Sequence, residues 1–189
     1  MRRSEVINEV AHCDGLIVAN LGFPSRELYA RQDSERNFYM LGSMGLASSI
    51  GMGIACSQNK RVFVIDGDGS VLMNLGSLAT VTRYAPSNYC LVIVDNKAYG
   101  STGNQPTCTA GKADLFKIAK AAGNHTVRRV KTIAALRRTL QLFSQTCLII
   151  IAETDSKADE VPVIPLTPVD IKVRFMREVK SRSKKTVNR

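Results

Sequence analysis

Two residues that could bind a metal ion follow two apolar segments in the middle of the chain. Asp68 comes shortly after residues 61–65, which are apolar from Val62 on, and Asn96 follows the apolar residues 89–94. Twenty-six residues separate Gly69 from Asn96, enough for one helix and one strand. We therefore expect Asp68 and Asn96 to meet at the carboxyl ends of neighbouring parallel strands. A carboxylate and an amide oxygen beside glycine-rich backbone suit a Mg²⁺ ion that also holds a diphosphate.

The elements that must position these residues follow an alternating pattern. Helical patterns alternate with short apolar segments, which predicts an α/β fold with a parallel sheet flanked by helices. The expected strands cover residues 16–19, 61–65, 89–94, 125–130 and 147–152. The expected helices cover residues 4–11, 72–84, 114–122, 133–144 and 169–179. Ser25 is a candidate N-cap for one more helix, which begins near Arg26.

Residues 41–55 are rich in glycine, alanine and serine. Small residues let a helix approach a sheet or another helix closely. Each glycine in a helix also costs about 1 kcal/mol of helix stability relative to alanine. We therefore expect tertiary contacts or a partner subunit to hold this helix in place.

The composition predicts one globular domain in a reducing compartment. With 189 residues, 44% of them hydrophobic, the chain is long enough for a well-buried core. No apolar run approaches the roughly 20 residues of a membrane helix, and no secretory signal follows Met1. The five cysteines form no CxxC pair, and their odd number without a pattern fits a reducing compartment. We expect a cytoplasmic protein that does not bind a membrane.

The net charge of +10 is concentrated at the C-terminus. In residues 171–189, eight basic residues stand against one acidic residue and leave a charge of +7. A basic tail can indicate nucleic-acid binding. However, no aromatic residue interleaves these charges after Phe175, and no nucleic-acid motif occurs elsewhere. We therefore expect a solvated tail or a contact with an acidic partner, and no nucleic acid.

The motifs resemble those of enzymes that use thiamine diphosphate. Gly67-Asp68-Gly69 followed by Asn96 matches the signature of these enzymes. Gly42-Ser43-Met44-Gly45 resembles the segment that carries the cofactor's aminopyrimidine in 2-oxoacid decarboxylases, and Asn20-Leu21-Gly22 resembles the segment after the first strand. From about residue 17 to 180 the chain is similar to the β subunits of sulfopyruvate decarboxylases, most clearly in RNFYMLGSMGLASSIGMG, VIDGDGSVLMNLGSL and DNKAYGSTGNQPT.

The resemblance implies a ligand set for the metal ion. The side chains of Asp68 and Asn96 and the backbone carbonyl of Ala98 would ligate Mg²⁺, which prefers hard oxygen ligands. Gly69 and Ser70 would offer backbone N–H groups, and Ser70 its hydroxyl, to the diphosphate. From the residues alone, the alternative is an ordinary Asp-Gly turn after a strand, followed by an asparagine in a tight turn.

The resemblance also implies three catalytic positions. Met44 would lie under the cofactor and force its two rings into a V shape, although a methionine that merely packs a helix is the alternative. The Gly42 carbonyl would accept a hydrogen bond from the 4′-amino group. Thr102 occupies the position of a catalytic glutamate in pyruvate decarboxylases, so Thr102, water or a partner group must handle the proton. All residues expected to contact the cofactor are Gly22, Gly42, Ser43, Met44, Gly67, Asp68, Gly69, Ser70, Asn96, Ala98 and Tyr99.

The family resemblance further implies that the chain is half of an enzyme. Residues 1–168 would form the diphosphate-binding domain and residues 169–189 a C-terminal helix with the basic tail. In this family a glutamate from a separate pyrimidine-binding domain contacts the cofactor. We expect an α subunit to supply that domain, with residues 44–56 and the tail as candidate contact surfaces. The expected reaction is decarboxylation of 3-sulfopyruvate, a small anionic 2-oxoacid, to sulfoacetaldehyde in the coenzyme M biosynthesis of methanogenic archaea.

Two alternatives to this function stay open at the level of sequence. A phosphonopyruvate decarboxylase, or another thiamine-diphosphate decarboxylase subunit, would act on a 2-oxoacid that can carry a similar tetrahedral anion. A non-catalytic module could bind the cofactor or stabilise a partner without turning over substrate. A neighbouring gene for the missing pyrimidine domain would favour an enzyme over such a module.

Overall fold

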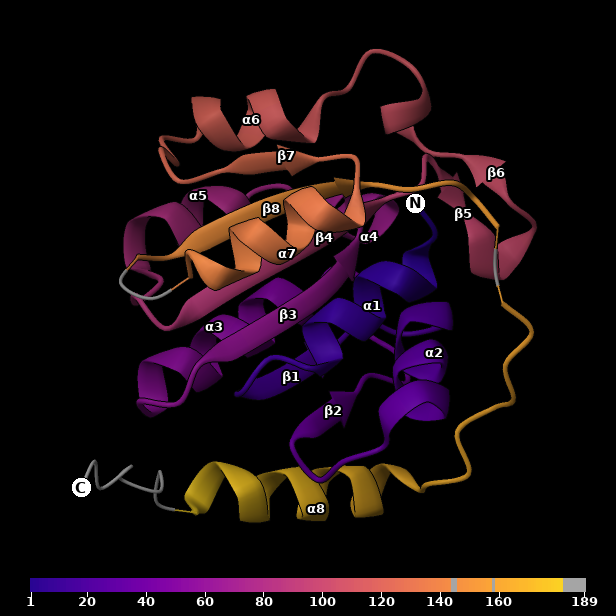
Figure 1. Ribbon diagram of the computed structural model, residues 1–189, viewed down its shortest axis with the longest axis vertical. Helices are drawn as coiled ribbons and strands as arrows, with labels where there is room; N and C mark the ends of the chain where they lie inside the picture. The colour runs from indigo at the N-terminus through magenta and orange to yellow at the C-terminus, as the bar shows by residue number, and fades with distance from the viewer. Residues whose placement is uncertain (144–145, 158, 182–189) are drawn as a thin grey trace.

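Six parallel strands form the central sheet of the computed structural model, which describes residues 1–143, 146–157 and 159–181 (Figure 1). Every neighbouring pair in this sheet is parallel, so the predicted fold class is confirmed. In spatial order the strands are β2 (Asn37–Tyr39), β1 (Leu16–Ala19), β3 (Val62–Gly67), β4 (Tyr89–Asp95), β8 (Leu148–Glu153) and β7 (Arg128–Val130).

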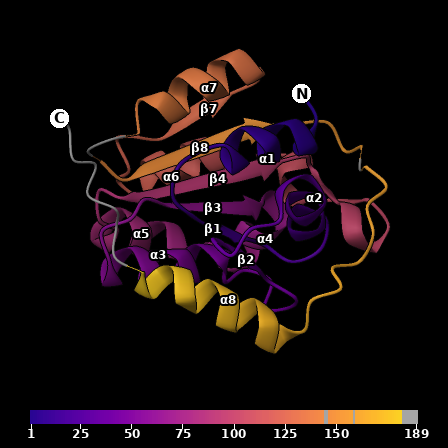
Figure 2. The ribbon, with the colours of Figure 1, turned by 60° about the horizontal axis from the view of Figure 1, so that its bottom comes forward.

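Helices cover both faces of the sheet because successive strand residues point to opposite sides. Ile17 and Phe63 face α1 (Arg3–Ala11), α2 (Phe23–Gln32) and α7 (Ile133–Gln141). Val18 and Val64 face the second layer, formed by α3 (Ala47–Ser57), α4 (Asp68–Met73), α5 (Ser77–Tyr84) and α6 (Leu115–Ala121). Figure 2 shows α1 and α7 on one side of the sheet and α3 and α5 on the other.

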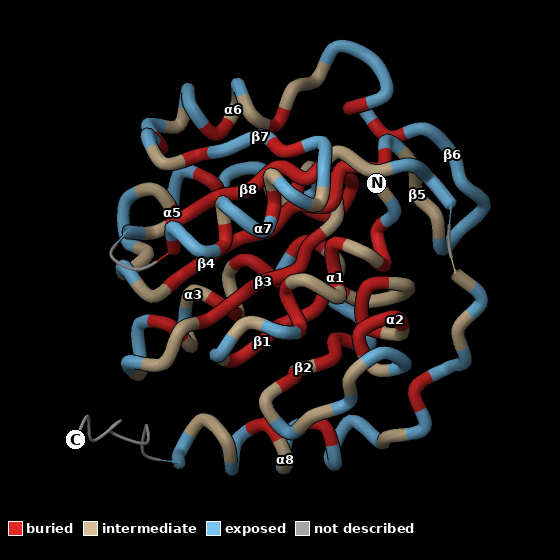
Figure 3. The backbone as a smooth tube through the Cα atoms, in the orientation of Figure 1, coloured by how far each residue is buried: buried red, intermediate tan, exposed pale blue. Residues whose placement is uncertain are grey.

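β1 and β4 are buried along their whole length, and β3 and β8 are buried except at their last residue (Figure 3). Burial on both faces explains why they read as unbroken apolar runs instead of alternating patterns. The chain passes from β1 outward to β2 and then returns to β3 on the other side of β1. The order of strands therefore reverses between β1 and β3, and ligands bind beyond the carboxyl ends of strands at such a point.

The last helix covers one edge of the sheet. α8 (Pro168–Lys180) begins with a reciprocal cap, in which Thr167 Oγ1 accepts from Asp170 N (3.1 Å) and donates to Asp170 Oδ2 (2.6 Å). The ring centroid of Phe175 lies 5.3 Å from that of Phe38 in β2, which anchors the helix. Among the described helices, none is long and apolar enough to cross a membrane.

Three expectations about helices were wrong in detail. Ser25 is not an N-cap, because α2 already begins at Phe23 and the Ser25 hydroxyl donates back to the carbonyls of β1 and its loop. Residues 72–84, expected as one helix, instead cover the end of α4 and the whole of α5. The glycine-rich helix begins at Ala47 and not near residue 41, since Ser43 and Gly45 have positive φ angles of 62° and 89°.

Two segment ends also differ from the expectation. β7 covers only Arg128–Val130, so residues 125–127 precede the strand. α7 ends at Gln141, and residue 144, where its end was expected, lies outside the described residues.

The close approach of α3 to the sheet depends on one glycine. A Cβ on Gly51 would lie 2.1 Å from Val64 Cγ2 of β3, whereas a Cβ on Gly53 would have no heavy atom within 4 Å. Tyr89 of β4 secures the same contact, since its buried hydroxyl donates to Ser48 O at 3.0 Å. The expectation that small residues let this helix pack closely is therefore confirmed at Gly51.

Gly51→Ala should destabilise the fold by about 1–3 kcal/mol, because the added methyl group overlaps Val64. Gly53→Ala is the matched control in the same helix and should stabilise it by about 0.4–1 kcal/mol, because it only lowers the entropy of the unfolded chain. Urea unfolding of both variants measures the difference. Equal effects on the two free energies of unfolding would contradict this account of α3.

Candidate functional site

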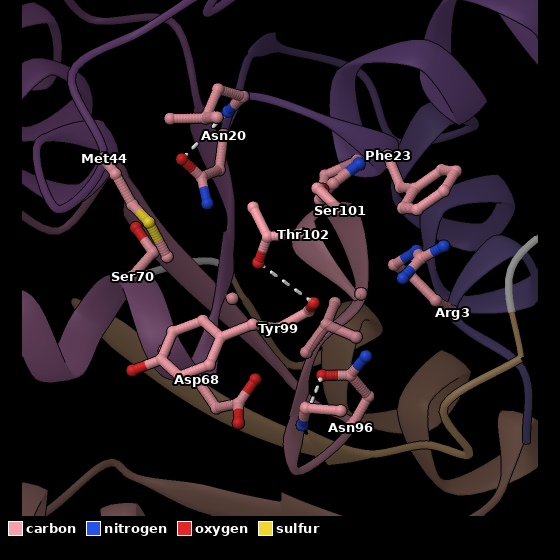
Figure 4. A pocket seen from close by; sticks show the side chains of 17 residues that line it. Arg3, Asn20, Phe23, Met44, Asp68, Ser70, Asn96, Tyr99, Ser101 and Thr102 are labelled. Atoms are coloured by element: carbon pink, nitrogen blue, oxygen red, sulfur yellow. Dashed lines mark hydrogen bonds between the residues drawn. The ribbon is translucent and has the colours of Figure 1, made fainter. Parts of the chain in front are cut away.

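A pocket lies at the carboxyl edge of the sheet, at the reversal of strand order between β1 and β3 (Figure 4). Nine of the predicted site residues line it: Met44, Gly67, Asp68, Gly69, Ser70, Asn96, Ala98, Tyr99 and Thr102. The lining also includes Arg3, Asn20, Leu21, Phe23, Pro24, Val94, Gly100 and Ser101. Gly22, Gly42 and Ser43 are not part of the lining, although each lies within two residues of a lining residue.

Asp68 and Asn96 meet as predicted, because β3 and β4 are neighbours in register with Gly67 beside Val94. One position of the Asn96 carboxamide lies 3.0 Å from Asp68 Oδ1 and 2.9 Å from Ala98 O. An amide nitrogen at this position would donate to both oxygens. An amide oxygen there, which accepts from Ala98 N at 3.3 Å (Figure 4), instead places three oxygens around one point.

Three converging oxygens repel one another unless a cation lies among them. The distances of 3.0 Å and 2.9 Å between these oxygens suit Mg²⁺. In an octahedral site with metal–oxygen distances of 2.0–2.1 Å, neighbouring ligand oxygens are about 2.9 Å apart. The charge also suits a cation, because burial raises the pKa of the Asp68 carboxyl, against hydrogen bonds from Thr107 and Thr109 that lower it. A divalent cation would favour the charged carboxylate that burial disfavours. These residues therefore fit a magnesium ion.

Two threonines hold the second oxygen of Asp68. Thr107 Oγ1 donates to Asp68 Oδ2 at 2.5 Å, and Thr109 Oγ1 lies 3.0 Å from the same oxygen. Thr109 Oγ1 also lies 2.8 Å from Oδ1 of the buried Asp95. With Oδ2 bonded in this way, Oδ1 is left facing Asn96. Sequence reasoning missed both threonines, since they lie on a loop that returns to Asp68 only in the folded chain.

Close backbone approach shapes the floor of the pocket. The ring of Tyr99 lies on Gly69, where a Cβ would be 2.3 Å from Tyr99 Cε1. Tyr99 belongs to the short hairpin of β5 (Ala98–Tyr99) and β6 (Gln105–Pro106). A side chain at position 69 would push this hairpin away from the first turn of α4. Glycine is therefore required there for a steric reason.

Met44 reaches the pocket from a loop and does not pack within a helix. Ser70 Oγ accepts from Gly45 N at 2.9 Å, and Asn74 Nδ2 donates to Gly45 O at 3.0 Å. These two bonds tie the loop before α3 to both ends of α4. Figure 4 shows the Met44 side chain beside Ser70 on one side of the pocket. Met44 therefore lines the pocket from a loop and is not itself part of a helix.

Thr102 lies at the exposed end of the pocket, in a single turn that runs from Gly100 to Thr102. Its hydroxyl lies 3.4 Å from both Tyr99 O and Gln105 Oε1. Ser101 of the same turn lies against Gly22, where a Cβ would be 2.5 Å from Ser101 Oγ. The turn thus connects the loop after β1 with the loop after β4, on opposite sides of β3.

Comparison with known protein families gives an independent view of this site. Residues 25–151 match the family described as thiamine pyrophosphate enzyme, C-terminal TPP binding domain. Benzoylformate decarboxylase from Polynucleobacter necessarius, a solved structure, has the same fold with a TM-score of 0.66. At 17% identity, that similarity spans 85% of this chain and 34% of the other.

Closer relatives exist among characterised sequences. Sulfopyruvate decarboxylase subunit beta of Methanocaldococcus jannaschii is 47% identical over 95% of this chain and 97% of its own length. Sulfopyruvate decarboxylase of Methanosarcina acetivorans is 41% identical over 86% of this chain but only 42% of its own. Phosphonopyruvate decarboxylase of Streptomyces viridochromogenes is 38% identical over 86% of this chain and 41% of its own. The chain therefore belongs to the thiamine pyrophosphate enzymes and, within them, to the family of sulfopyruvate decarboxylase β subunits.

Proposed function

We propose that the chain is the β subunit of a decarboxylase that depends on thiamine diphosphate and Mg²⁺ and converts 3-sulfopyruvate to sulfoacetaldehyde and CO₂. The observation that carries the proposal is the 47% identity to a sulfopyruvate decarboxylase subunit beta along nearly the whole of both chains. We place the reaction in the cytoplasm and in coenzyme M biosynthesis. Five free thiols fit the reducing compartment that this location implies.

The pocket residues have distinct tasks in this proposal. Asp68, Asn96 and the Ala98 carbonyl would hold Mg²⁺, and Thr107 and Thr109 would keep Asp68 oriented towards it. The backbone N–H groups of Gly69 and Ser70 lie in the first turn of α4, where they lack helical partners and suit phosphate oxygens.

Chemistry at the reacting carbon depends on the cofactor and on few side chains. When bound, thiamine diphosphate supplies the nucleophilic carbon and the electron sink for loss of CO₂. Met44 would support the ring system from below, and the Gly42 carbonyl would accept a hydrogen bond from the 4′-amino group. Thr102, which lines the exposed end of the pocket, would position a proton or a water molecule there.

The active site requires a second chain in this proposal. Among the described lining residues, Asp68 is the single carboxylate, so the pocket holds no glutamate for the pyrimidine ring. Beside Met44 lies an exposed apolar patch, defined here as Leu41, Leu46, Met73 and Leu75, with exposed fractions of 53%, 43%, 63% and 37%. The hydrogen bond from Asn74 Nδ2 to Gly45 O joins the two segments that carry this patch, residues 41–46 and residues 73–75. We assign this patch to an α subunit that carries the pyrimidine-binding domain and its glutamate.

Two relatives with longer chains support an active site shared between two domains. The Methanosarcina acetivorans enzyme extends well beyond the part that matches this chain, which leaves room for a second domain in the same polypeptide. The similarity to a phosphonopyruvate decarboxylase favours that reaction as the second candidate. Both substrates are small 2-oxoacids with a tetrahedral anion, so only an assay distinguishes them.

The chain alone should release no CO₂ from 3-sulfopyruvate in the presence of Mg²⁺ and thiamine diphosphate, and mixing it with the α subunit should give activity. Phosphonopyruvate and pyruvate serve as competing substrates in the same assay. Full turnover by the isolated chain would contradict the shared site. Preference for phosphonopyruvate would overturn the substrate while leaving the cofactor in place.

Thr109→Val should weaken Mg²⁺ binding by about 10- to 100-fold, because it removes a hydroxyl that orients the ligand Asp68. Thr139→Val is the matched control, since among the described residues its hydroxyl bonds to Ala135 O within α7, which contributes no residue to the pocket lining. Calorimetric titration with Mg²⁺ at saturating thiamine diphosphate, in the presence of the α subunit, measures the Mg²⁺ affinity of both variants. Unchanged affinity in Thr109→Val would show that this threonine does not orient the ligand.

Met73→Lys should prevent assembly with the α subunit, because a charge in the apolar patch stays buried and unpaired at the interface. Leu142→Lys alters a residue of similar exposure (76%) beyond the end of α7 and should assemble normally. Sedimentation of the mixed subunits reports assembly directly. A complex of wild-type affinity with Met73→Lys would place the interface elsewhere.

A further inference from the structure

An arginine that sequence reasoning did not select lies at the wall of the pocket. Arg3, the first residue of α1, is 4% exposed, and its partner Glu27 in α2 is fully buried. Arg3 Nε donates to Glu27 Oε2 at 3.0 Å, and Nη2 donates to Oε1 at 2.7 Å. The guanidinium carbon also lies 4.9 Å from the ring centroid of Phe23. These contacts fix the orientation of the guanidinium group.

The remaining nitrogen of this group faces the pocket. Within residues 1–143, 146–157 and 159–181, Arg3 Nη1 makes no hydrogen bond, although both other nitrogens are bonded. Nη1 lies 3.7 Å from the point that a Cβ on Gly100 would occupy, and the Asn96 amide lies 3.9 Å from the same point. Figure 4 shows Arg3 between Phe23 and Asn96, across the pocket from Met44 and Ser70. The wall of the pocket therefore carries an N–H donor without a hydrogen-bond partner among the described residues, close to the proposed ligand Asn96.

The charges in the pocket call for such a donor. Arg3 is the single cationic side chain among the described residues that line it. A diphosphate carries about three negative charges at neutral pH, which is more than one Mg²⁺ ion neutralises. In the proposed site the diphosphate would also lie beside the negative charge of Asp68. An arginine N–H of fixed orientation is well suited to a phosphate oxygen, and its bond to an anion is stronger than a neutral one.

We propose that Arg3 binds the terminal phosphate of the thiamine diphosphate through Nη1, while Glu27 holds the guanidinium in place. This inference rests on the proposed function, since it assumes the same cofactor. Its location favours the diphosphate over the substrate, because Arg3 is next to the ligand Asn96 and across the pocket from Met44. Arg3 is thus a residue of the cofactor site, and Glu27 is a positioning residue that acts through it.

The test compares two lysine variants of the chain, each assembled with the α subunit, by calorimetry, with inorganic diphosphate and thiamine diphosphate as ligands in saturating Mg²⁺. In Arg3→Lys, the side chain has a single nitrogen, which cannot pair with Glu27 and also occupy the position of Nη1 in the pocket. We expect about 10- to 100-fold weaker binding of both ligands, as for the loss of one hydrogen bond to a charged group. Arg137→Lys changes a similar bidentate pair with Glu9 on the surface and should bind as the wild type does.

A second variant keeps the test valid if Arg3→Lys does not fold. Arg3→Gln combined with Glu27→Gln removes both buried charges together and should also lose diphosphate affinity, whereas Glu27→Gln alone should retain most of it. Thiamine without phosphate is the ligand control, and the Arg3 variants should not change its binding. Thermal unfolding of each variant confirms that it is folded.

The outcomes separate the inference from the proposed function. If the wild type binds neither ligand, the cofactor assignment fails and the inference fails with it. If the wild type and both Arg3 variants bind the diphosphates equally, the cofactor assignment stands and the role of Arg3 is wrong. Weaker binding of thiamine itself would also overturn the inference, because it would indicate a general change of the pocket and not a lost phosphate contact.

Discussion

The burial of one carboxylate governs the arrangement of this pocket. Asp68 lies where β3 ends and α4 begins, with 2% of its surface exposed. Burial of a charge without a partner is costly, so the surroundings must provide hydrogen bonds, and a bound cation would also favour the charged carboxylate. Thr107 and Thr109 bond one carboxylate oxygen, and the other faces Asn96 and the Ala98 carbonyl. The loops after β3 and β4 are held together by these contacts.

Glycines at a few positions let the backbone come close enough to form the pocket. Tyr99 can lie on α4 only because Gly69 has no Cβ, and α3 can reach β3 only because Gly51 has none. α3 follows directly after the loop of Met44, and Ser70 bonds that loop at Gly45. The packing of α3 on the sheet and the position of Met44 in the pocket are therefore linked.

The pocket is better suited to hold a cofactor than to complete a reaction. It contains oxygen ligands for a metal, backbone donors and a fixed arginine, but its described lining has no glutamate. The apolar patch beside Met44 is the type of surface that a partner covers. A site divided between chains would make catalysis depend on assembly. Two relatives have longer chains, of which this chain matches 42% and 41%.

The sequence by itself determined the fold class and the meeting of Asp68 with Asn96. Both follow from local patterns, because buried apolar strands are continuous in sequence and parallel neighbours end at the same edge of the sheet. The tertiary structure alone decided where α2 and α3 begin, since Ser25 bonds to a neighbouring strand and positive φ angles at Ser43 and Gly45 delay α3. It alone also revealed Thr107, Thr109 and the Arg3–Glu27 pair. Arg3 lies 24 positions from Glu27, and Thr107 and Thr109 lie 39 and 41 positions from Asp68, so these contacts leave no periodic trace in one sequence.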